Sequence, residues 1–134
     1  MLPLRIMLTH PSLVPPMIVL LCKHPAVKKY DLSSVRMLMS GAAPLSSELT
    51  NQLAALLPDC WIGQAYGMTE TCTAVTFPPI DRKIGTLGSG GILLPGCTAR
   101  VVRPDGSLAP PGEPGELVVT GPSMALGYMN NPQA

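Results

Sequence analysis

Residues 33–65 alternate between two hydrophobic patterns, and this alternation restricts the fold more than any other feature of the chain. Segment 35–39 carries apolar side chains on both faces, as a strand buried on both sides does. A segment with helical periodicity follows it, and Trp61 and Ile62 then begin a second apolar stretch, expected to be the central strand. A crossover of this length favours parallel pairing of the two strands. The pattern predicts an α/β fold with a partial parallel sheet.

The helix between these strands has clear start and stop signals. Ser46 is a good N-cap, and Glu48 in the first turn suits the positive end of the helix dipole. Pro58 ends the helix. Four leucines recur at helical spacing and predict a core-facing stripe: Leu49, Leu53, Leu56 and Leu57.

An earlier helix is expected to begin at Pro15-Pro16 and to end near His24-Pro25, because proline fits the first helical turn. Its side chains are apolar nearly all round, which predicts a buried helix. Residues 6–14 are expected to form a strand or an extended entry, and residues 26–32 a polar connector. The two prolines interrupt the N-terminal apolar run, so a signal peptide is not favoured.

The C-terminal part of the chain changes to short strands and tight turns. Residues 73–77 are β-branched and predict a strand, and a boundary is placed after residue 82. The α/β portion is therefore 1–82, and the small β-rich portion is 83–134. Strands are expected at 98–103 and 116–120, joined by the turn Pro104-Asp105-Gly106 and a Pro/Gly-rich loop at 109–115.

Composition excludes several classes of function. The 134 residues carry a net charge of +1, and basic residues are not interleaved with aromatic ones, so no nucleic-acid surface is indicated. No apolar run reaches the roughly 18 residues that a membrane span needs. Only 13% of residues are charged, below the usual quarter or so, as expected of a piece of a larger interior. Such a piece leaves sheet edges unpaired and apolar faces uncovered, so we expect poor solubility of the chain when it is expressed alone.

The four cysteines lack metal-ligand spacing, and neither histidine completes a zinc set. They are expected to be buried, reduced thiols of an intracellular protein.

The stretch from Cys60 to Thr71 concentrates groups that suit a nucleotide. A short strand over 60–65 is expected to run into a turn at Gly67. Tyr66 offers a ring for stacking, Thr69 a hydroxyl for a phosphate oxygen, and Glu70 a carboxylate for a divalent cation. Mg²⁺ binds a few hard oxygens together with waters and substrate phosphates, so a single Glu is enough as the protein's ligand. A polar loop between two strands is the alternative interpretation.

The glycine-rich stretch from Gly85 to Gly91 has two glycines, Gly85 and Gly90, at the spacing of a phosphate loop. Gly91-Ile92 stand where the Lys-Ser/Thr pair of a phosphate loop is required, so a structural loop is predicted.

Three motifs resemble those of the adenylate-forming enzymes, a superfamily that includes acyl-CoA synthetases, 4-coumarate–CoA ligases and firefly luciferase. The segment Tyr66-Gly67-Met68-Thr69-Glu70 is similar to the family's Y-G-x-T-E motif. Ser40-Gly41-Ala42-Ala43-Pro44-Leu45 is similar to its upstream S-G-A-A-P-L turn. Residues 115–122, followed by Gly127-Tyr128, resemble the downstream G-E-L…G-P…G-Y segment. The likeness extends from about Thr9 to the C-terminus and is closest to the 4-coumarate–CoA ligase-like branch.

The resemblance implies roles for individual residues. Thr69, on the α-phosphate, and Glu70, on Mg²⁺, would be the catalytic pair, with Glu70 as the metal ligand. Tyr66 would stack on adenine. Cofactor binding is implied for Gly41, Ala42, Ala43, Pro44, Tyr66, Gly67, Met68 and Thr69. Borders of the acyl pocket are implied for Ser40, Gly41, Gln64, Ala65 and Gly67.

Two further positions, Ala65 and Glu116, bear on the acyl pocket and on the β-structure. Many relatives have Gly where this chain has Ala65, and the added methyl is expected to narrow the acyl pocket. Glu116 is expected to support the β-structure rather than to react.

The family's chemistry implies ATP/AMP, Mg²⁺ and coenzyme A, and a small-molecule carboxylic acid as substrate. An AMP-forming acid–CoA ligase activates the acid as an acyl-adenylate and transfers it to CoA. Location in the cytoplasm or in peroxisomes is expected, and the oligomeric state is left open. The family's phosphate loop, its ribose-binding Asp and its catalytic Lys are not among the residues present, so the isolated chain is expected to be inactive. The alternative is a non-catalytic remnant that binds nucleotide weakly or binds a protein partner.

Overall fold

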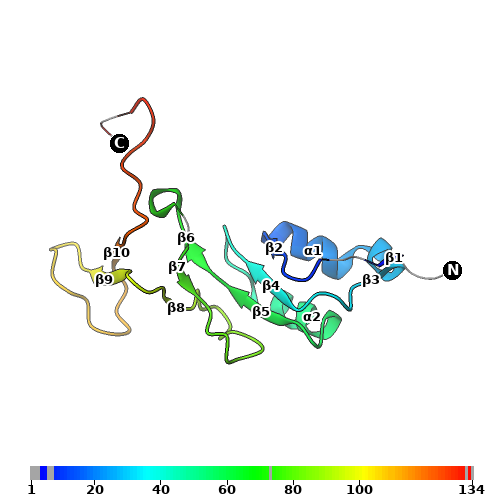
Figure 1. Cartoon of the computed structure of the whole chain (residues 1–134). Coiled ribbons are helices and arrows are strands. Elements are labelled where there is room, and N and C mark those ends of the chain that lie inside the picture. Colours follow the sequence, from blue (N-terminus) through cyan, green and yellow to red (C-terminus); the bar gives the residue numbers. More distant parts are fainter. Residues whose placement is uncertain (1–3, 6–7, 73, 132, 134) are drawn as a thin grey trace. The chain divides into compact units, whose positions relative to one another are not determined.

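A computed structural model describes residues 4–5, 8–72, 74–131 and 133 (Figure 1). The chain divides into two compact units, the first formed by residues 1–66 and 76–92 and the second by residues 67–75 and 93–134. The boundary predicted after residue 82 concerns the subdomains of a complete family enzyme and stays a prediction.

A parallel three-stranded sheet is the centre of the first unit. Its strands are β2 (Ser12–Leu13), β4 (Met37–Ser40) and β5 (Trp61–Gln64), in the order β2-β4-β5. All pairs in it are parallel, which confirms the α/β prediction. The middle strand is β4 and not β5, so the predicted central strand was wrong. On its other side β5 has a single parallel bridge, Ile62 to Ile84.

Helix α2 (Ser47–Leu56) forms where its start and stop signals predicted. The Ser46 hydroxyl accepts a hydrogen bond from the Leu49 amide at 3.2 Å and caps the first turn. Leu49, Leu53 and Leu57 are buried, as the stripe predicted. Leu56 is 38% exposed, so its assignment to the buried stripe was wrong.

Helix α1 (Pro15–Lys23) has the predicted bounds but not the predicted burial. Only Ile18 among its residues is buried, whereas Met17 is 51% and Leu20 59% exposed. Periodicity shows that a helix is apolar but not what covers each of its faces. One face of α1 packs with α2 into the core cluster that contains Ile18, Leu38 and Leu53.

The connector after α1 is more ordered than predicted. It forms the 3₁₀ helix η1 (Pro25–Lys29) and the strand β3 (Tyr30–Asp31), which pairs in parallel with β1 (Leu4–Arg5). The strand expected over 6–14 is limited to β2, and residues 6–7 lie outside the described residues.

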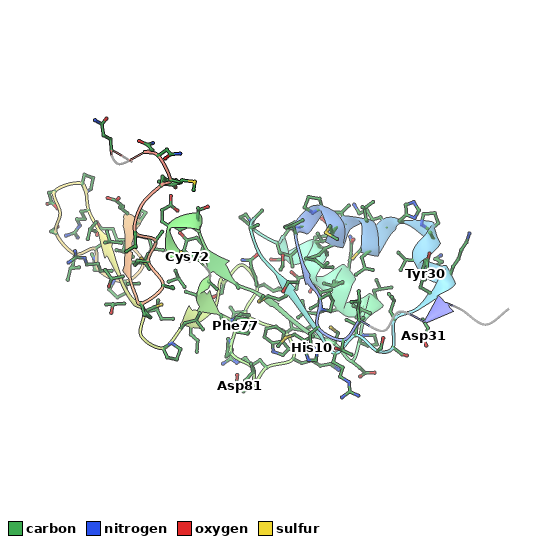
Figure 2. The ribbon with its side chains drawn as sticks, turned by 45° about the horizontal axis from the view of Figure 1, so that its top comes forward. His10, Tyr30, Asp31, Cys72, Phe77 and Asp81 are labelled. Carbon is green, nitrogen blue, oxygen red and sulfur yellow. The ribbon has the colours of Figure 1, made fainter. Side chains whose placement is uncertain are left out.

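A second three-stranded sheet has the order β6-β7-β8. Its strands are β6 (Tyr66–Gly67), β7 (Ala74–Phe77) and β8 (Ile92–Leu93). The strand predicted over 73–77 is confirmed as β7, with Thr73 outside the described residues. The turn predicted at Gly67 lies later, because Gly67 is still part of β6. In the first unit the Phe77 ring (Figure 2) stacks on Trp61, with ring centroids 5.8 Å apart.

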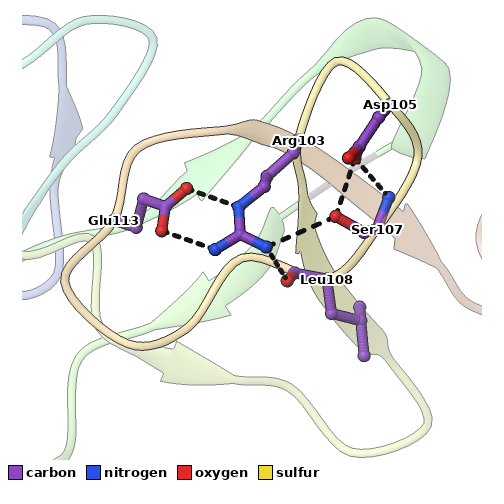
Figure 3. Close-up of polar contacts among 5 residues, drawn as sticks. All are labelled: Arg103, Asp105, Ser107, Leu108 and Glu113. Carbon is purple, nitrogen blue, oxygen red and sulfur yellow. Dashed lines mark hydrogen bonds and ion pairs between the residues drawn. The ribbon is translucent and has the colours of Figure 1, made fainter.

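The C-terminal hairpin of the second unit pairs β9 (Thr98–Val102) with β10 (Glu116–Thr120) in antiparallel register. This confirms both predicted strands. Gly106 in the predicted turn has φ of 82°, a conformation that glycine adopts without strain. Arg103 holds the intervening loop through a two-point contact with Glu113, at 2.6 and 2.8 Å (Figure 3).

The cysteines are free thiols, as predicted, but they differ in burial. Cys60 is buried, and this burial raises the pKa of its thiol. Cys72 is exposed, so the prediction that all four are buried was wrong. Among the described residues, no helix has the length and apolar character that crossing a membrane requires.

Candidate functional site

Two loops predicted to belong to one site start at neighbouring strand ends in the first unit. Ser40 ends β4 and pairs with Gln64, which ends β5. The Ala65 amide donates to the Ser40 carbonyl at 3.0 Å. The Gln64 Oε1 atom accepts from the Leu45 amide at 2.5 Å, so one side chain ties the second strand end to the first loop. The structure therefore brings together both loops at the carboxyl edge of the sheet, where open α/β sheets bind ligands.

The loop after β4 presents backbone rather than bulky side chains. Gly41 donates its amide to the Leu13 carbonyl at 3.2 Å, and a Cβ added at Gly41 would meet no atom within 4 Å. Ala42 has φ of 68°, which is uncommon for a residue with a side chain. Ala43 and Pro44 are exposed. A flat group such as a purine can approach such a surface closely, so the loop fits the adenine role.

Tyr66 is 39% exposed, so part of its ring faces solvent. The glycine-rich loop from Gly85 to Gly91 lies beside Tyr66. A Cβ added at Gly90 would lie 3.1 Å from the Tyr66 Cβ and 3.2 Å from the Thr76 hydroxyl. That hydroxyl donates to the Gly90 carbonyl at 2.6 Å. Gly90 therefore allows the loop to approach Tyr66 closely.

A small cavity of about 20 Å³ lies beside Gln64. Its walls include Leu45, Thr50 and the loop from Gly85 to Ser89, all of the first unit. The space is enough for about one water molecule. The cavity is therefore far smaller than the roughly 300–1,000 Å³ of a typical small-molecule pocket.

The second unit contains the remaining motif residues. The 3₁₀ helix η2 (Thr69–Thr71) follows Met68, and the Thr71 hydroxyl closes the turn. This hydroxyl donates to the Met68 carbonyl at 2.9 Å and accepts from the Met68 amide at 3.0 Å. Thr69 and Glu70 are both exposed, whereas Thr71 is fully buried. Thr71 thus anchors a turn that presents the predicted catalytic pair to solvent.

Glu70 has a partner that sequence reasoning did not assign to the site. The Tyr128 hydroxyl donates to the Glu70 Oε1 atom, and the Ala125 amide donates to the Glu70 carbonyl at 2.7 Å. The hydrogen bond from Tyr128 holds the pKa of the Glu70 carboxyl below its ordinary value, with a further contribution from the backbone of Glu70. The same bond raises the pKa of Tyr128. The one sequence signal for this residue was its membership of the Gly127-Tyr128 motif.

Glu70 suits Mg²⁺ better than a cation whose ligands must all come from protein side chains. No group of three His, Cys, Asp or Glu side chains gathers anywhere in residues 4–5, 8–72, 74–131 and 133. Mg²⁺ is usually held by one or two carboxylates together with waters and substrate phosphates. An exposed, ionised Glu70 meets that requirement.

Comparison with known proteins identifies the family. A family profile described as AMP-binding enzyme matches residues 5–129. The chain belongs to the AMP-binding enzyme family. The matched range includes all three motifs that the sequence shares with the adenylate-forming enzymes.

Individual relatives in the AMP-binding enzyme family point to one branch. The chain is 41% identical over 128 residues to 4-coumarate–CoA ligase 1 of Solanum tuberosum, covering 90% of the chain and 23% of the relative. It is also 41% identical over 127 residues to 4-coumarate–CoA ligase 2 of Oryza sativa subsp. japonica, covering 92% of the chain and 22% of the relative. The chain therefore spans about a quarter of the length of these relatives.

Solved structures show the same fold. The luciferase-like enzyme of the nonluminescent mealworm Zophobas morio matches with a TM-score of 0.80 and 32% identity, over 90% of the chain and 30% of that protein. A long-chain-fatty-acid-CoA ligase of Archaeoglobus fulgidus matches with a TM-score of 0.79 and 29% identity, over 91% of the chain and 26% of that protein. The α/β assignment and the adenylate-forming resemblance are both confirmed.

Proposed function

We propose that the chain carries the adenine- and acyl-binding elements of an AMP-forming acid–CoA ligase. Such an enzyme activates a carboxylic acid with ATP to an acyl-adenylate and transfers the acyl group to CoA. Two hydrogen bonds that join the motif loops carry the proposal. The Ala65 amide donates to the Ser40 carbonyl, and the Leu45 amide donates to the Gln64 side chain. The similarity to 4-coumarate–CoA ligases supports the choice of reaction.

In this proposal the first unit binds the organic parts of the adenylate. The Tyr66 ring stacks on adenine, and the backbone of Gly41, Ala42 and Ala43 forms the opposing surface. Pro44 belongs to the first of these cofactor-binding loops, and Gly67, the first residue of the second unit, continues the chain after Tyr66 and also binds the cofactor. Ser40, Gln64 and Ala65 border the acyl group. The Ser40 hydroxyl is buried and has no partner among the described residues, which leaves a polar atom available at this border.

The second unit supplies the charge-handling groups. Thr69 binds the α-phosphate, Met68 shapes the turn, and Glu70 holds Mg²⁺. When bound, Mg²⁺ offsets negative charge on the phosphates. The chain's own contribution is positioning and electrostatic stabilisation, which act on the transition state only when all participants are in place. CoA enters as the acyl acceptor.

Photolabelling tests the adenine assignment. We expect 8-azido-ATP to label residues of the 41–44 loop or Tyr66 on irradiation, and excess ATP to prevent this labelling. Mass spectrometry of the digested chain locates the modified peptide. Labelling that is spread over other segments, or that excess ATP does not reduce, would contradict the proposal.

A further inference from the structure

The Gly127-Tyr128 motif has no role in the function proposed above, yet the structure connects it to the proposed metal ligand. The Tyr128 hydroxyl donates to Glu70 across 58 positions of sequence. Both residues belong to the second unit, so the contact lies within one compact body. Close contact between two such distant motifs indicates a shared task.

The contact is built on backbone anchors at both of its ends. The Glu70 carbonyl accepts from the Ala125 amide at 2.7 Å, which holds segment 125–128 against the η2 turn. Beyond Tyr128, Asn131 donates its amide to the Tyr128 carbonyl at 3.1 Å and forms a small antiparallel bridge with it. Tyr128 is 46% exposed, and its hydroxyl makes a side-chain hydrogen bond to Glu70. Its hydroxyl is therefore the group with the most specific contact.

We propose that Tyr128 is a positioning residue that orients the Glu70 carboxylate toward the divalent cation. This inference rests on the metal role proposed for Glu70. A carboxylate offers about four acceptor positions, so the bond to Tyr128 at Oε1 leaves capacity for a cation. Carboxylates that bind metals are commonly held by hydrogen bonds of this kind, and loss of such a partner typically weakens metal binding by about 10–100-fold.

Tyr128→Phe removes the hydroxyl and keeps the ring, so it separates positioning from packing. Tyr30→Phe is the matched control, because Tyr30 is similarly exposed (41%) and belongs to the first unit. The first readout is the ¹³C chemical shift of the Glu70 carboxyl carbon at neutral pH, which requires neither metal nor activity. The second readout is Mn²⁺ affinity at saturating ATP, followed by electron paramagnetic resonance.

We expect Tyr128→Phe to move the Glu70 carboxyl signal and to weaken Mn²⁺ binding about tenfold, while Tyr30→Phe changes neither. An unchanged carboxyl signal in Tyr128→Phe would overturn the inference. So would an unchanged Mn²⁺ affinity in Tyr128→Phe, provided that Glu70→Gln loses the metal. If the parent chain binds no Mn²⁺, or if Glu70→Gln binds it as tightly as the parent does, the metal role of Glu70 fails and the inference fails with it.

Discussion

The backbone amide of Ala65 donates a hydrogen bond to the carbonyl of Ser40 at 3.0 Å, and this bond joins the two motif loops of the first unit. It continues the parallel ladder of β4 and β5 by one position beyond the last paired residues, Ser40 and Gln64. The loop after β4 and the segment that leads to Tyr66 therefore begin next to each other at the edge of the sheet.

Gly63 in β5 is predicted to be intolerant of any side chain. A Cβ at this position would lie 2.3 Å from the Pro78 Cγ and 2.4 Å from the Trp61 ring. Neither neighbour has a flexible end that can move aside, so we expect Gly63→Ala to lower the free energy of unfolding by about 1–3 kcal/mol. Urea denaturation measures this change. Gly41→Ala, where the added Cβ meets no atom within 4 Å, serves as the stability control, and equal midpoints for the two variants would contradict the packing described here.

The N-cap of α2 offers a second stability test. Ser46→Ala removes the hydroxyl that accepts from the Leu49 amide, and we expect a loss of about 1 kcal/mol. Ser47→Ala removes the adjacent exposed hydroxyl, which lies within the helix and does not cap it. Thermal unfolding followed by circular dichroism compares the two variants. If Ser47→Ala destabilises the chain as much as Ser46→Ala does, the cap is not at Ser46.

The contact between Arg103 and Glu113 predicts a pH-dependent contribution to stability. The Arg103 guanidinium holds the pKa of the Glu113 carboxyl below its ordinary value. A carboxyl whose pKa is lowered by folding stabilises the folded state fully above its unfolded-state pKa of about 4.3. This contribution is lost as the pH falls through the lower folded-state pKa. We therefore expect Arg103→Met to lower the Tm most at neutral pH and progressively less in acid.

Arg100→Met is the control for the Arg103 experiment, because Arg100 is an exposed arginine of β9, the strand that ends just before Arg103. Its Tm difference from the parent chain should not follow the Glu113 titration. A Tm difference for Arg103→Met that stays constant from neutral to acid pH would show that the Glu113 contact does not stabilise the hairpin loop.

We also predict that the isolated chain of 134 residues catalyses no acid-dependent exchange between ATP and pyrophosphate. Adenylation requires the phosphate-binding, ribose-binding and catalytic lysine groups of the family together with the residues present here. The measurement is incorporation of labelled pyrophosphate into ATP with 4-coumarate, benzoate and octanoate in turn. Exchange above the no-protein background with any of these acids would refute the prediction.

Local signals in the sequence predicted much of the fold. The cap at Ser46 and the leucine spacing located α2 to within a residue, because both signals act inside the helix itself. Strand patterns located β4, β5, β9 and β10 with boundary shifts of at most two residues, and β10 without any shift. Burial of α1 was not predictable in this way, since it depends on what packs against each face. Periodicity contains no information about that neighbour.

For the site, too, residues close together in the sequence were predictable and contacts between distant residues were not. Motif residues such as Tyr66 and Glu70 were found because they lie within one short segment. Their assignment as ligand-binding residues stays a prediction. The partner of Glu70 was missed, because Tyr128 is 58 positions away and no spacing rule connects them. The contact between Gly90 and Tyr66 was missed for the same reason.

The central claim is that the two loops of the first unit form a functional half-site for an acyl-adenylate. Isothermal titration calorimetry of a non-hydrolysable acyl-adenylate analogue tests it most directly, with the parent chain, Tyr66→Ala and the control Tyr30→Ala. We expect the parent chain and Tyr30→Ala to bind the analogue saturably, and Tyr66→Ala to lose this binding. Absence of binding to a well-folded parent chain, or binding that Tyr66→Ala retains, would show that the motifs do not bind an adenylate in this protein.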